Sequence, residues 1–524
     1  MSTDPSSGAS SGGVSYKQVD AEYFQKRGLK RYAKVWSLWA LGVGAVISGH
    51  YSGWNFGLAN GFGSMLVAAL IIAAMYWGLI LSLAEMSPAL PHTGAAYSFA
   101  RSAMGPWGGM FTGLAESIEY ILTPAVIVFF IGSYMTAIFG TPPEWQPAWW
   151  AASYVVFLLL NLIGVELSFR VSVLVTVAAL AILAVYWVSA IPAIDFDRWA
   201  LNIGVAADGV TKVELPEGGG SWFPFGINGV LATLPFAVWL FLAIEQLPLA
   251  AEESADPKKD MPKGLIFGML TLMVSALLIT FLNSSVGSME EGKMHGAFTL
   301  STSGEPLLDG FRVLYGNAAA KTLAFLAVIG LIASFHTIIY AYGRQIYSLA
   351  RAGYYLPFLS LTNKSKVPHV ALYAGSVLGF TTMLILWFAV KGDATKSTAI
   401  IGGTLLNMAV FGAMISYAMQ GLSFVVLRNK MPNIVRPYRS PVGVPGALVT
   451  ITIALLTIYY QLQDPAYIKG VYAALAWYGA GLLYFVVFGR HRLILSPEEQ
   501  FALNVSDRAA AAVSSSAEVR SPAG

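Results

Sequence analysis

The stretch GVGAVISGHYSGWNFG, from Gly42 to Gly57, lies inside an apolar segment that is long enough to cross a bilayer. It contains five glycines, two serines, a histidine and an asparagine. A glycine inside a helix costs about 1 kcal/mol relative to alanine, and a histidine in hydrocarbon needs a polar partner. Close helix packing explains glycines at four-residue spacing, but it leaves the polar cluster unexplained. The stretch therefore favours a helix that is interrupted at mid-membrane, where freed peptide groups face a cavity.

The composition of the whole chain points to lipid as its surroundings. Of 524 residues, 56% are hydrophobic and 11% are charged, and the mean hydropathy is +0.63. Soluble domains carry about 25% charged residues. The absence of cysteine excludes disulfides and thiol chemistry. A net charge of +3 gives no indication of a nucleic-acid partner. The polar, Ser- and Gly-rich start lacks an apolar run, so we expect no cleavable signal.

Apolar runs near the roughly 20 residues that a bilayer requires recur along the chain. Backbone groups cannot stay unpaired in hydrocarbon, so these runs predict an all-α integral membrane protein with twelve transmembrane helices. The runs cover approximately residues 36–60, 64–90, 105–139, 148–166, 169–193, 227–251, 263–286, 320–350, 369–391, 397–427, 443–463 and 466–489. Most of the 31 lysines and arginines fall on one side if both termini are cytoplasmic.

The sixth run carries a carboxylate between two prolines. In LATLPFAVWLFLAIEQLPLAAEE, from Leu231 to Glu253, Pro235 and Pro248 flank Glu245. A carboxylate at mid-bilayer costs at least about 2.5 kcal/mol. Two explanations stay open: a structural glutamate that is bonded to amides freed by a proline, or a counter-charge for a cation or a proton. The stretch from Leu231 to Glu253 contains no glycine, so its interruption is signalled more weakly than that of span one.

Spans one and six lie five helices apart, which predicts two inverted five-helix repeats with a binding site between the two broken helices. The two longest loops on the other side, near residues 194–226 and 287–319, can carry short helices. The predicted parts are a polar cytoplasmic N-terminal tail (1–34), a first five-helix repeat (35–193), an extracellular loop (194–226), a second, inverted repeat (227–428), helices eleven and twelve (429–490) and a largely disordered cytoplasmic C-terminal tail (491–524).

Two further carboxylates occur in span three. Glu116 and Glu119 are three residues apart and share one helix face. Two carboxylates this close are rarely both ionised in a dry site. They are either contacts that hold the bundle together or carriers of a coupling proton.

Span eight has polar residues near its middle and a cation near its end. Ser334 and Thr337 are candidates for the site, and His336 is either a hydrogen-bonded packing residue or a proton relay. Glu85 in span two and Arg344 in span eight lie near inner ends, where each serves as an inner gate or as a structural residue.

Several stretches resemble the amino acid–polyamine–organocation transporters. The similarity is carried by LSLAEMSPALPHTGAAYSFARSAMGPWGG (81–109), AAEESADPKKDMPKG (250–264) and SLARAGYYLPFLS (348–360). Within that superfamily the chain is most similar to bacterial ethanolamine permeases, through ISGHYSGWNFGLA, GPWGGMFTGLAESIEY and LPFAVWLFLAIEQLPLAAEE. His50 stands where those permeases carry an acidic residue, and Ala179 stands where many proton-coupled relatives carry a lysine.

The resemblance implies a LeuT-like five-plus-five fold with discontinuous helices one and six and two further helices. Together with the residue patterns it gives a substrate site and a set of coupling candidates. The substrate-site candidates are Ile47, Ser48, Gly49, His50, Tyr51, Glu119, Trp239, Phe241, Leu242, Ala243 and Glu245. The coupling candidates are Glu116, Glu119, Glu245 and His336, with a proton or sodium as the coupling ion.

These observations predict a secondary transporter in the cytoplasmic membrane that imports a small amine, first of all ethanolamine, by alternating access. The alternative is a transporter or exchanger of the same superfamily for an amino acid, a polyamine or another small amine, and a channel is the alternative class. We expect no enzymatic activity, no cofactor, no metal site and no nucleic-acid partner. The expected partners are the amine and membrane lipid, with the chain as a monomer or a homodimer.

Overall fold

The computed structural model describes residues 10–495 apart from residues 12, 18, 291–292, 295, 391–400 and 464–467. Within these residues, ten helices are long and apolar enough to cross a membrane. Two shorter apolar helices, Val35–His50 and Gly226–Val238, stand where spans one and six are predicted. The fold is therefore the expected all-α membrane protein. The C-terminal tail that is expected to be disordered lies almost entirely outside the described residues.

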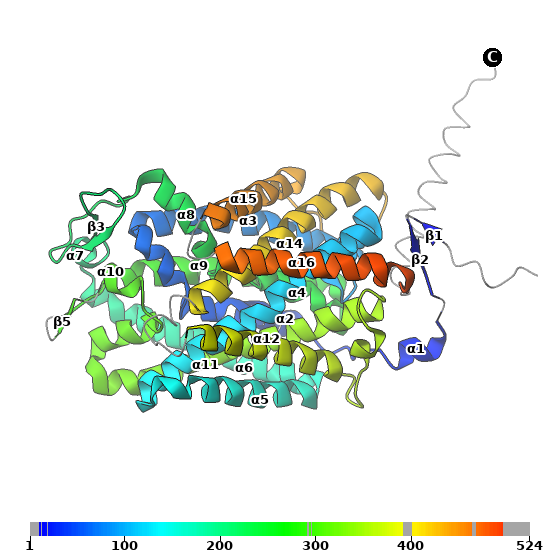
Figure 1. Cartoon of the computed structure of the whole chain (residues 1–524), viewed down its shortest axis with the longest axis horizontal. Coiled ribbons are helices and arrows are strands. Elements are labelled where there is room, and N and C mark those ends of the chain that lie inside the picture. The colour runs from blue at the N-terminus through cyan, green and yellow to red at the C-terminus, as the bar shows by residue number, and fades with distance from the viewer. Residues whose placement is uncertain are drawn as a thin grey trace, which may run out of the picture.

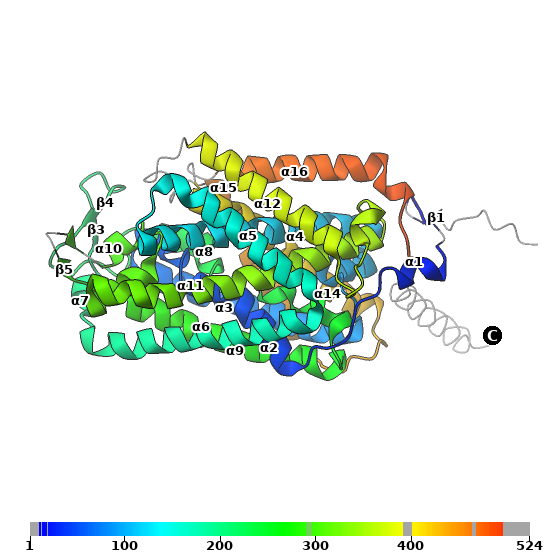
Figure 2. The same cartoon turned by 90° about the horizontal axis from the view of Figure 1, so that it is seen from below.

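The long helices lie side by side along the longest axis of the molecule (Figure 1), as the perpendicular view in Figure 2 also shows. The helices that match predicted spans are α2 (Val35–Val46), α3 (Phe62–Ala89), α4 (Ala95–Phe139), α5 (Gln146–Ile163), α6 (Val165–Ala190), α8 (Gly226–Val238), α9 (Pro257–Ser284), α11 (Pro306–Arg351), α12 (His369–Ala389), α14 (Gly403–Lys430), α15 (Gly443–Gln463) and α16 (Ile468–Val487).

Short elements gather at the two ends of this bundle. We call the end that holds α1 (Ala21–Gln25), β1 (Ser10–Ser11) and β2 (Val14–Ser15) the terminal end (Figure 1). The opposite, loop end holds α7 (Phe196–Trp199), α10 (Ala297–Leu300), β3 (Ile203–Val205), β4 (Lys212–Glu214), β5 (Met289–Glu290) and β6 (Lys293–Met294). The 3-10 turns outside the interrupted spans are η3 (Pro143–Trp145), η4 (Ile191–Ala193), η6 (Pro357–Ser360) and η8 (Gly489–His491).

Two helices are longer than their apolar runs. Helix α4 begins ten residues before the predicted start at 105, and α11 begins well before 320. Each bends at a glycine with positive φ, Gly105 at 79° and Gly316 at 72°. The additional turns carry charged residues such as Arg101 and Asp309, so hydropathy alone assigns them to loops. Of the two long loops, each contains the expected short helix, and the pairing of β3 with β4 was not expected.

Span one is interrupted where its glycines predict. Helix α2 ends at Val46, and the 3-10 helix η1 (Ile47–His50), a turn at 51–53 and the 3-10 helix η2 (Trp54–Asn60) follow. Gly53 has a φ of 95°, which side-chain-bearing residues rarely adopt. A Cβ at Gly53 would lie 2.7 Å from two atoms of the Trp239 ring. The glycine thus permits both the turn and the close approach of span six.

Span six is interrupted without a glycine. Helix α8 ends at Val238, residues 239–243 form a turn, and the 3-10 helix η5 (Ile244–Glu253) completes the span. The turn closes at Ala243, whose φ of 84° is left-handed. This conformation costs a residue with a side chain roughly 1–2 kcal/mol. It is usually marked in a sequence by glycine, and the alanine at this position gives no such indication. Both interruptions agree with the prediction, whereas the relation of the two halves as inverted repeats stays a prediction.

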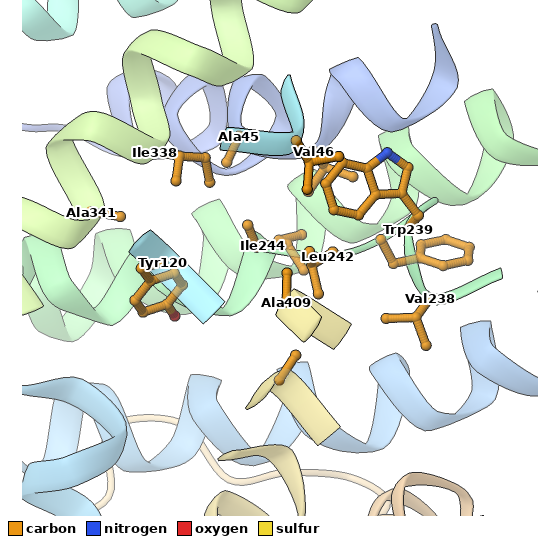
Figure 3. Close-up of a cluster of buried hydrophobic side chains, with 14 of the residues drawn as sticks. Ala45, Val46, Tyr120, Val238, Trp239, Leu242, Ile244, Ile338, Ala341 and Ala409 are labelled. Atoms are coloured by element: carbon orange, nitrogen blue, oxygen red, sulfur yellow. The ribbon is translucent and has the colours of Figure 1, made fainter. Parts of the chain in front are cut away.

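The two interruptions lie in the buried centre of the bundle. Figure 3 shows Ala45 and Val46 of α2 near Trp239 and Leu242 of span six, with Ile338 of α11 on the other side. Val46, Trp239 and Leu242 are each only 2% exposed, and Ala45 is 1% exposed. The centre is therefore closed toward both ends in this structure.

The glycine at the first interruption gives a test of this packing. Gly53→Ala should lower the stability of the detergent-purified protein by about 2–4 kcal/mol, because the left-handed φ and the Trp239 ring both oppose a methyl group. The control is Gly479→Ala in α16, where a Cβ meets nothing within 4 Å. Thermal unfolding followed by tryptophan fluorescence measures both variants. Equal midpoints would contradict the assigned role of Gly53.

Candidate functional site

The two interruptions are bonded to each other through side chains. The Trp239 indole donates from Nε1 to the carbonyl of Ser52 over 3.0 Å. The Trp239 carbonyl in turn lies directly against Gly49, where any side chain would collide with it. Spans one and six therefore meet at their turns, as the sequence predicts for the centre of the site.

His50 occupies a bridging position in this contact. Its Nε2 lies 2.9 Å from the carbonyl of Leu240 in span six, and its Nδ1 lies 2.7 Å from Oγ of Ser275 in α9. A carbonyl only accepts, so Nε2 carries the proton and Nδ1 accepts from the serine. Both ring nitrogens of this predicted substrate residue are thus engaged in protein contacts.

Other side chains satisfy the peptide groups that the interruption of span one frees. The hydroxyl of Ser334 donates to the carbonyl of Gly44 over 2.6 Å and accepts from the amide of Ser48 over 2.8 Å. The side chain of Asn55 accepts from the amide of Gly53 over 3.0 Å. Buried peptide groups without partners are costly, and these contacts remove that cost while the site is closed.

Tyr51 reaches the neighbouring helix α6. Its hydroxyl donates to the carbonyl of Ala179 over 2.7 Å. Gly330 in α11 makes room for the Tyr51 ring, because a Cβ there would collide with it. The carbonyl of Tyr51 accepts from the hydroxyl of Tyr134 over 3.0 Å. Tyr51 is thereby fixed by helices α4, α6 and α11.

The remaining apolar candidates line the closed centre. Ile47 and Leu242 are buried, and the Phe241 ring packs against Tyr76 with 5.5 Å between ring centroids. The hydroxyl of Thr337 donates to carbonyls of its own helix over 3.0 Å, while its methyl group faces Gly44.

Glu245 and Glu119 form the polar part of the centre, where their carboxyl groups are in hydrogen-bonding contact. Glu245 accepts from the amide of Ala243 over 3.0 Å and from the hydroxyl of Tyr120 over 3.2 Å. Glu245 is therefore bonded to a backbone amide, as the structural explanation predicts. That amide belongs to the left-handed turn at Ala243, however, and is not one that a proline frees. We refer to Glu119 and Glu245 as the carboxyl pair.

Glu119 is less well supplied with donors than Glu245. Its Oε1 accepts from the hydroxyl of Tyr417 over 3.0 Å, and that hydroxyl oxygen accepts from Tyr76 over 3.1 Å. Its Oε2 is buried and receives no hydrogen bond from any donor group of the described residues. Among the described residues, the donors to the carboxyl pair are thus tyrosine hydroxyls and one main-chain amide, all of them neutral. Oε2 of Glu119 is open, in the sense that it accepts from none of them.

Glu116 lies one helical turn away on the same face of α4. Its carboxylate accepts from the amide of Gln345 in α11 over 2.7 Å. The side-chain oxygen of Gln345 is buried without a partner, as is that of Gln420 in α14. Three buried acceptors on three helices, including Glu119 Oε2, therefore lack donors in this part of the described structure.

His336 does not join this group. Its ring contacts the side chains of Asn161 in α5 over 3.1 Å and Ser168 in α6 over 3.2 Å. It therefore lies on the side of α11 that faces α5 and α6, and its position agrees with the packing explanation.

Ion pairs hold the terminal end of the bundle. Arg344 bonds to Glu253 with contacts of 2.9 and 3.2 Å, and its guanidinium lies 3.7 Å above the Tyr340 ring, whose hydroxyl also bonds to Glu253. The main-chain carbonyl of Glu253 accepts from the amides of Tyr32 and Ala33. This cluster ties α11 and the end of span six to the segment that enters span one.

A second cluster lies on the other side of the same end. Glu85 bonds to Arg428 over 2.6 Å, to Arg436 over 3.0 Å and to the amide of Ser440 over 2.8 Å. It joins α3 to the end of α14 and to the loop that follows. Both sequence candidates at inner ends are therefore parts of ion-pair clusters.

Sequence reasoning missed the residues that complete these groups. Tyr76, Tyr417, Gln345 and Ser275 each sit inside an apolar run, where a single polar residue is normally read as packing. Glu253 belongs to the motif AAEESADPKKDMPKG (250–264), but the sequence pattern indicates no role for it. The available signal was their alignment with Glu116, Glu119 and His50 across helices, which requires the fold to be known.

The family model described as amino acid permease matches residues 40–495. The chain belongs to the amino acid permease family. It is a transporter with several membrane spans and not an enzyme.

The permease has distant relatives over nearly its whole length. It is 26% identical to an uncharacterized transporter of Rhizobium meliloti (strain 1021), over 81% of this chain and 85% of that protein. It is 22% identical to the methylthioribose transporter of Bacillus subtilis (strain 168), over 90% and 96%, and 22% identical to the branched-chain amino acid permease BcaP of the same organism, over 89% and 94%. Relatives that are named for such different substrates agree on the transporter class and leave the substrate of this chain open.

The ion pair at the terminal end generates one prediction. Glu253→Gln should destabilise the permease by about 3–5 kcal/mol, because it leaves the buried Arg344 charge uncompensated. The double variant Glu253→Gln, Arg344→Met should recover most of this loss. The midpoint of thermal unfolding measures both. If the double variant is no more stable than the single one, the pair does not act as a unit.

A second prediction concerns the loop end, outside the membrane-spanning segments. Burial and the neighbouring Asp309 carboxylate raise the pKa of Glu305 from an ordinary 4.5 to about 8. The folded chain then holds this proton more tightly than the unfolded chain, so stability should fall as the pH rises from about 4.5 to about 8. Glu305→Gln should remove this part of the pH dependence in thermal unfolding, whereas Glu166→Gln at an exposed ion pair should not. Parallel curves for wild type and Glu305→Gln would contradict the assignment.

Proposed function

We propose that the permease is a secondary transporter that imports a small amine, with ethanolamine as the first candidate, across the cytoplasmic membrane by alternating access. The carrying observation is the buried carboxyl pair beside the turn of span six, with Oε2 of Glu119 open. The resemblance to ethanolamine permeases selects ethanolamine among the small amines. The basic residues at the terminal end support a cytoplasmic location for that end.

An organic ammonium group matches the carboxyl pair in charge and in hydrogen bonding. Primary amines stay protonated at neutral pH, as the lysine side chain does. Such a group carries three N–H donors, and Glu119 Oε2 accepts from none of the donors among the described residues. Tyr120, whose hydroxyl bonds to Glu245, adds a neutral aromatic surface for a cation. The pair can thus replace part of the hydration shell that the ammonium loses on binding.

The peptide groups at the turns have a secondary role in this proposal. Ser334, Asn55 and Trp239 already bond to them in the closed structure. The hydroxyl of ethanolamine is a small polar group that can exchange with one of these side-chain contacts. The ammonium is therefore assigned to the carboxyl pair, and the hydroxyl to the segment Ser48–His50.

An amino acid is the second candidate, and the family and its relatives favour it. Its ammonium would use the same carboxyl pair. Its carboxylate would need amide donors at the turn of span one, where Ser334 now accepts from the amide of Ser48. An amino acid therefore requires Ser334 to release that amide, whereas ethanolamine does not.

A binding screen separates these candidates. We expect ethanolamine to raise the melting temperature of the purified permease, with choline much weaker because its ammonium has no N–H donor. Polyamines, common amino acids and buffers with and without sodium complete the screen. Stabilisation by neutral amino acids alone would replace the amine with an amino acid as substrate.

Glu245→Gln provides the matching variant test. Loss of a charged hydrogen-bond acceptor costs about 1.5–3 kcal/mol, so uptake of ethanolamine into proteoliposomes should fall roughly 10- to 100-fold. The amount of folded protein should change little. Glu166→Gln, a half-exposed surface carboxylate, is the control and should transport normally. Equal loss of uptake and of folded protein would support a purely structural Glu245.

Counterflow distinguishes a carrier from a channel. Unlabelled substrate inside the vesicles should accelerate entry of labelled substrate, because a carrier returns faster when loaded. A rate that does not saturate and is not stimulated from the other side would indicate a channel.

A further inference from the structure

The hydrogen bonds of the carboxyl pair are unequal. Glu245 receives a main-chain amide on one oxygen and the hydroxyl of Tyr120 on the other. Within the part of the chain that the structure describes, Glu119 receives the hydroxyl of Tyr417 on one oxygen and no donor on the other. Donors stabilise the charged form of a carboxyl group. The negative charge of the pair therefore belongs on Glu245, and the neutral, protonated form belongs on Glu119.

Two contacting carboxyl groups in a dry site share one proton, since two adjacent negative charges are strongly unfavourable. The other titratable groups that face them are neutral tyrosines and one acid: Tyr76 from α3, Tyr120 and Glu116 from α4, Tyr417 from α14 and Tyr478 from α16. The four tyrosines are uncharged near neutral pH, and Glu116 is bonded to Gln345 rather than to the pair, so the balance of an arriving cation falls to the pair itself.

We propose, on the basis of the proposed function, that the carboxyl pair releases its proton when the ammonium group of the substrate binds, so that the permease exchanges one proton for one organic cation. The O–H bond of Glu119 breaks, the proton leaves the pair, and the N–H groups of the ammonium donate to both carboxylates. The pair has a charge of minus one before binding, and the pair with its cation has minus one afterwards. The loaded and the empty carrier therefore have the same charge when they change conformation.

The released proton passes to water on the side from which the amine enters, because the loaded carrier then takes the amine and not the proton to the other side. Glu116 lies one helical turn from Glu119 on α4, and it bonds to Gln345 in α11. The side-chain oxygens of Gln345 and of Gln420 in α14 are buried and accept from no group in the described chain. Such oxygens can accept hydrogen bonds from water that enters between α4, α11 and α14.

Isothermal titration calorimetry measures this step directly. Ethanolamine is titrated into purified permease near pH 7 in phosphate, PIPES and HEPES, whose ionisation enthalpies differ. The observed heat should vary with buffer by an amount that equals about one proton released per ethanolamine bound. Glu119→Gln, which cannot release a proton, should bind with a buffer-independent heat, and Glu166→Gln should behave as wild type.

The outcomes separate this inference from the proposed function. Saturable binding to the wild-type permease with the same heat in all three buffers overturns the proton exchange and leaves amine transport intact. Absence of binding heat for every amine overturns the proposed function and this inference together. The wild-type measurement decides between these results even if Glu119→Gln fails to fold.

Discussion

Peptide groups at mid-bilayer must be hydrogen-bonded, and the rest of this structure depends on how the two interrupted helices meet that constraint. A continuous helix would satisfy these peptide groups within each span. Instead, Trp239 bonds to span one, His50 bonds to span six, and Ser334 and Asn55 bond to the peptide groups around the first turn. Because these partners come from different helices, movement of one bundle against the other has to exchange bonds at the centre of the protein.

The buried carboxylates fall into two kinds that differ in their partners. At the terminal end, Glu253 and Glu85 are matched by arginines, and their charges are compensated within the fold. At the centre, Glu119 and Glu245 have only uncharged donors. A buried negative charge without a cation is costly. The terminal end is thus stable as it stands, whereas the centre gains stability when a proton or an ammonium group is present.

Hydropathy predicted all twelve spans and the glycine-rich stretch predicted the first interruption, because these features depend on local composition. The turn at Ala243 was predicted only from the nearby Glu245 and its flanking prolines, because alanine does not indicate a left-handed conformation. Glu116, Glu119 and Glu245 were identified as candidates from their cost in lipid. Their grouping, and the bridging position of His50, depend on contacts between helices that are far apart in sequence. The roles assigned to the site residues remain predictions.

The contacts of His50 bear on the acidic residue that ethanolamine permeases carry at this position. The imidazole donates to the Leu240 carbonyl, which a carboxylate cannot do, so an acid at position 50 would leave that carbonyl without its donor. In this chain the acids lie instead on α4 and span six, where Glu245 accepts from the amide of Ala243 at the turn and Glu119 accepts from the hydroxyl of Tyr417. A cation can therefore be neutralised without a charge on span one itself. In the proposed function, span one therefore provides shape and hydrogen bonds, and the carboxyl pair provides the charge for an ammonium group.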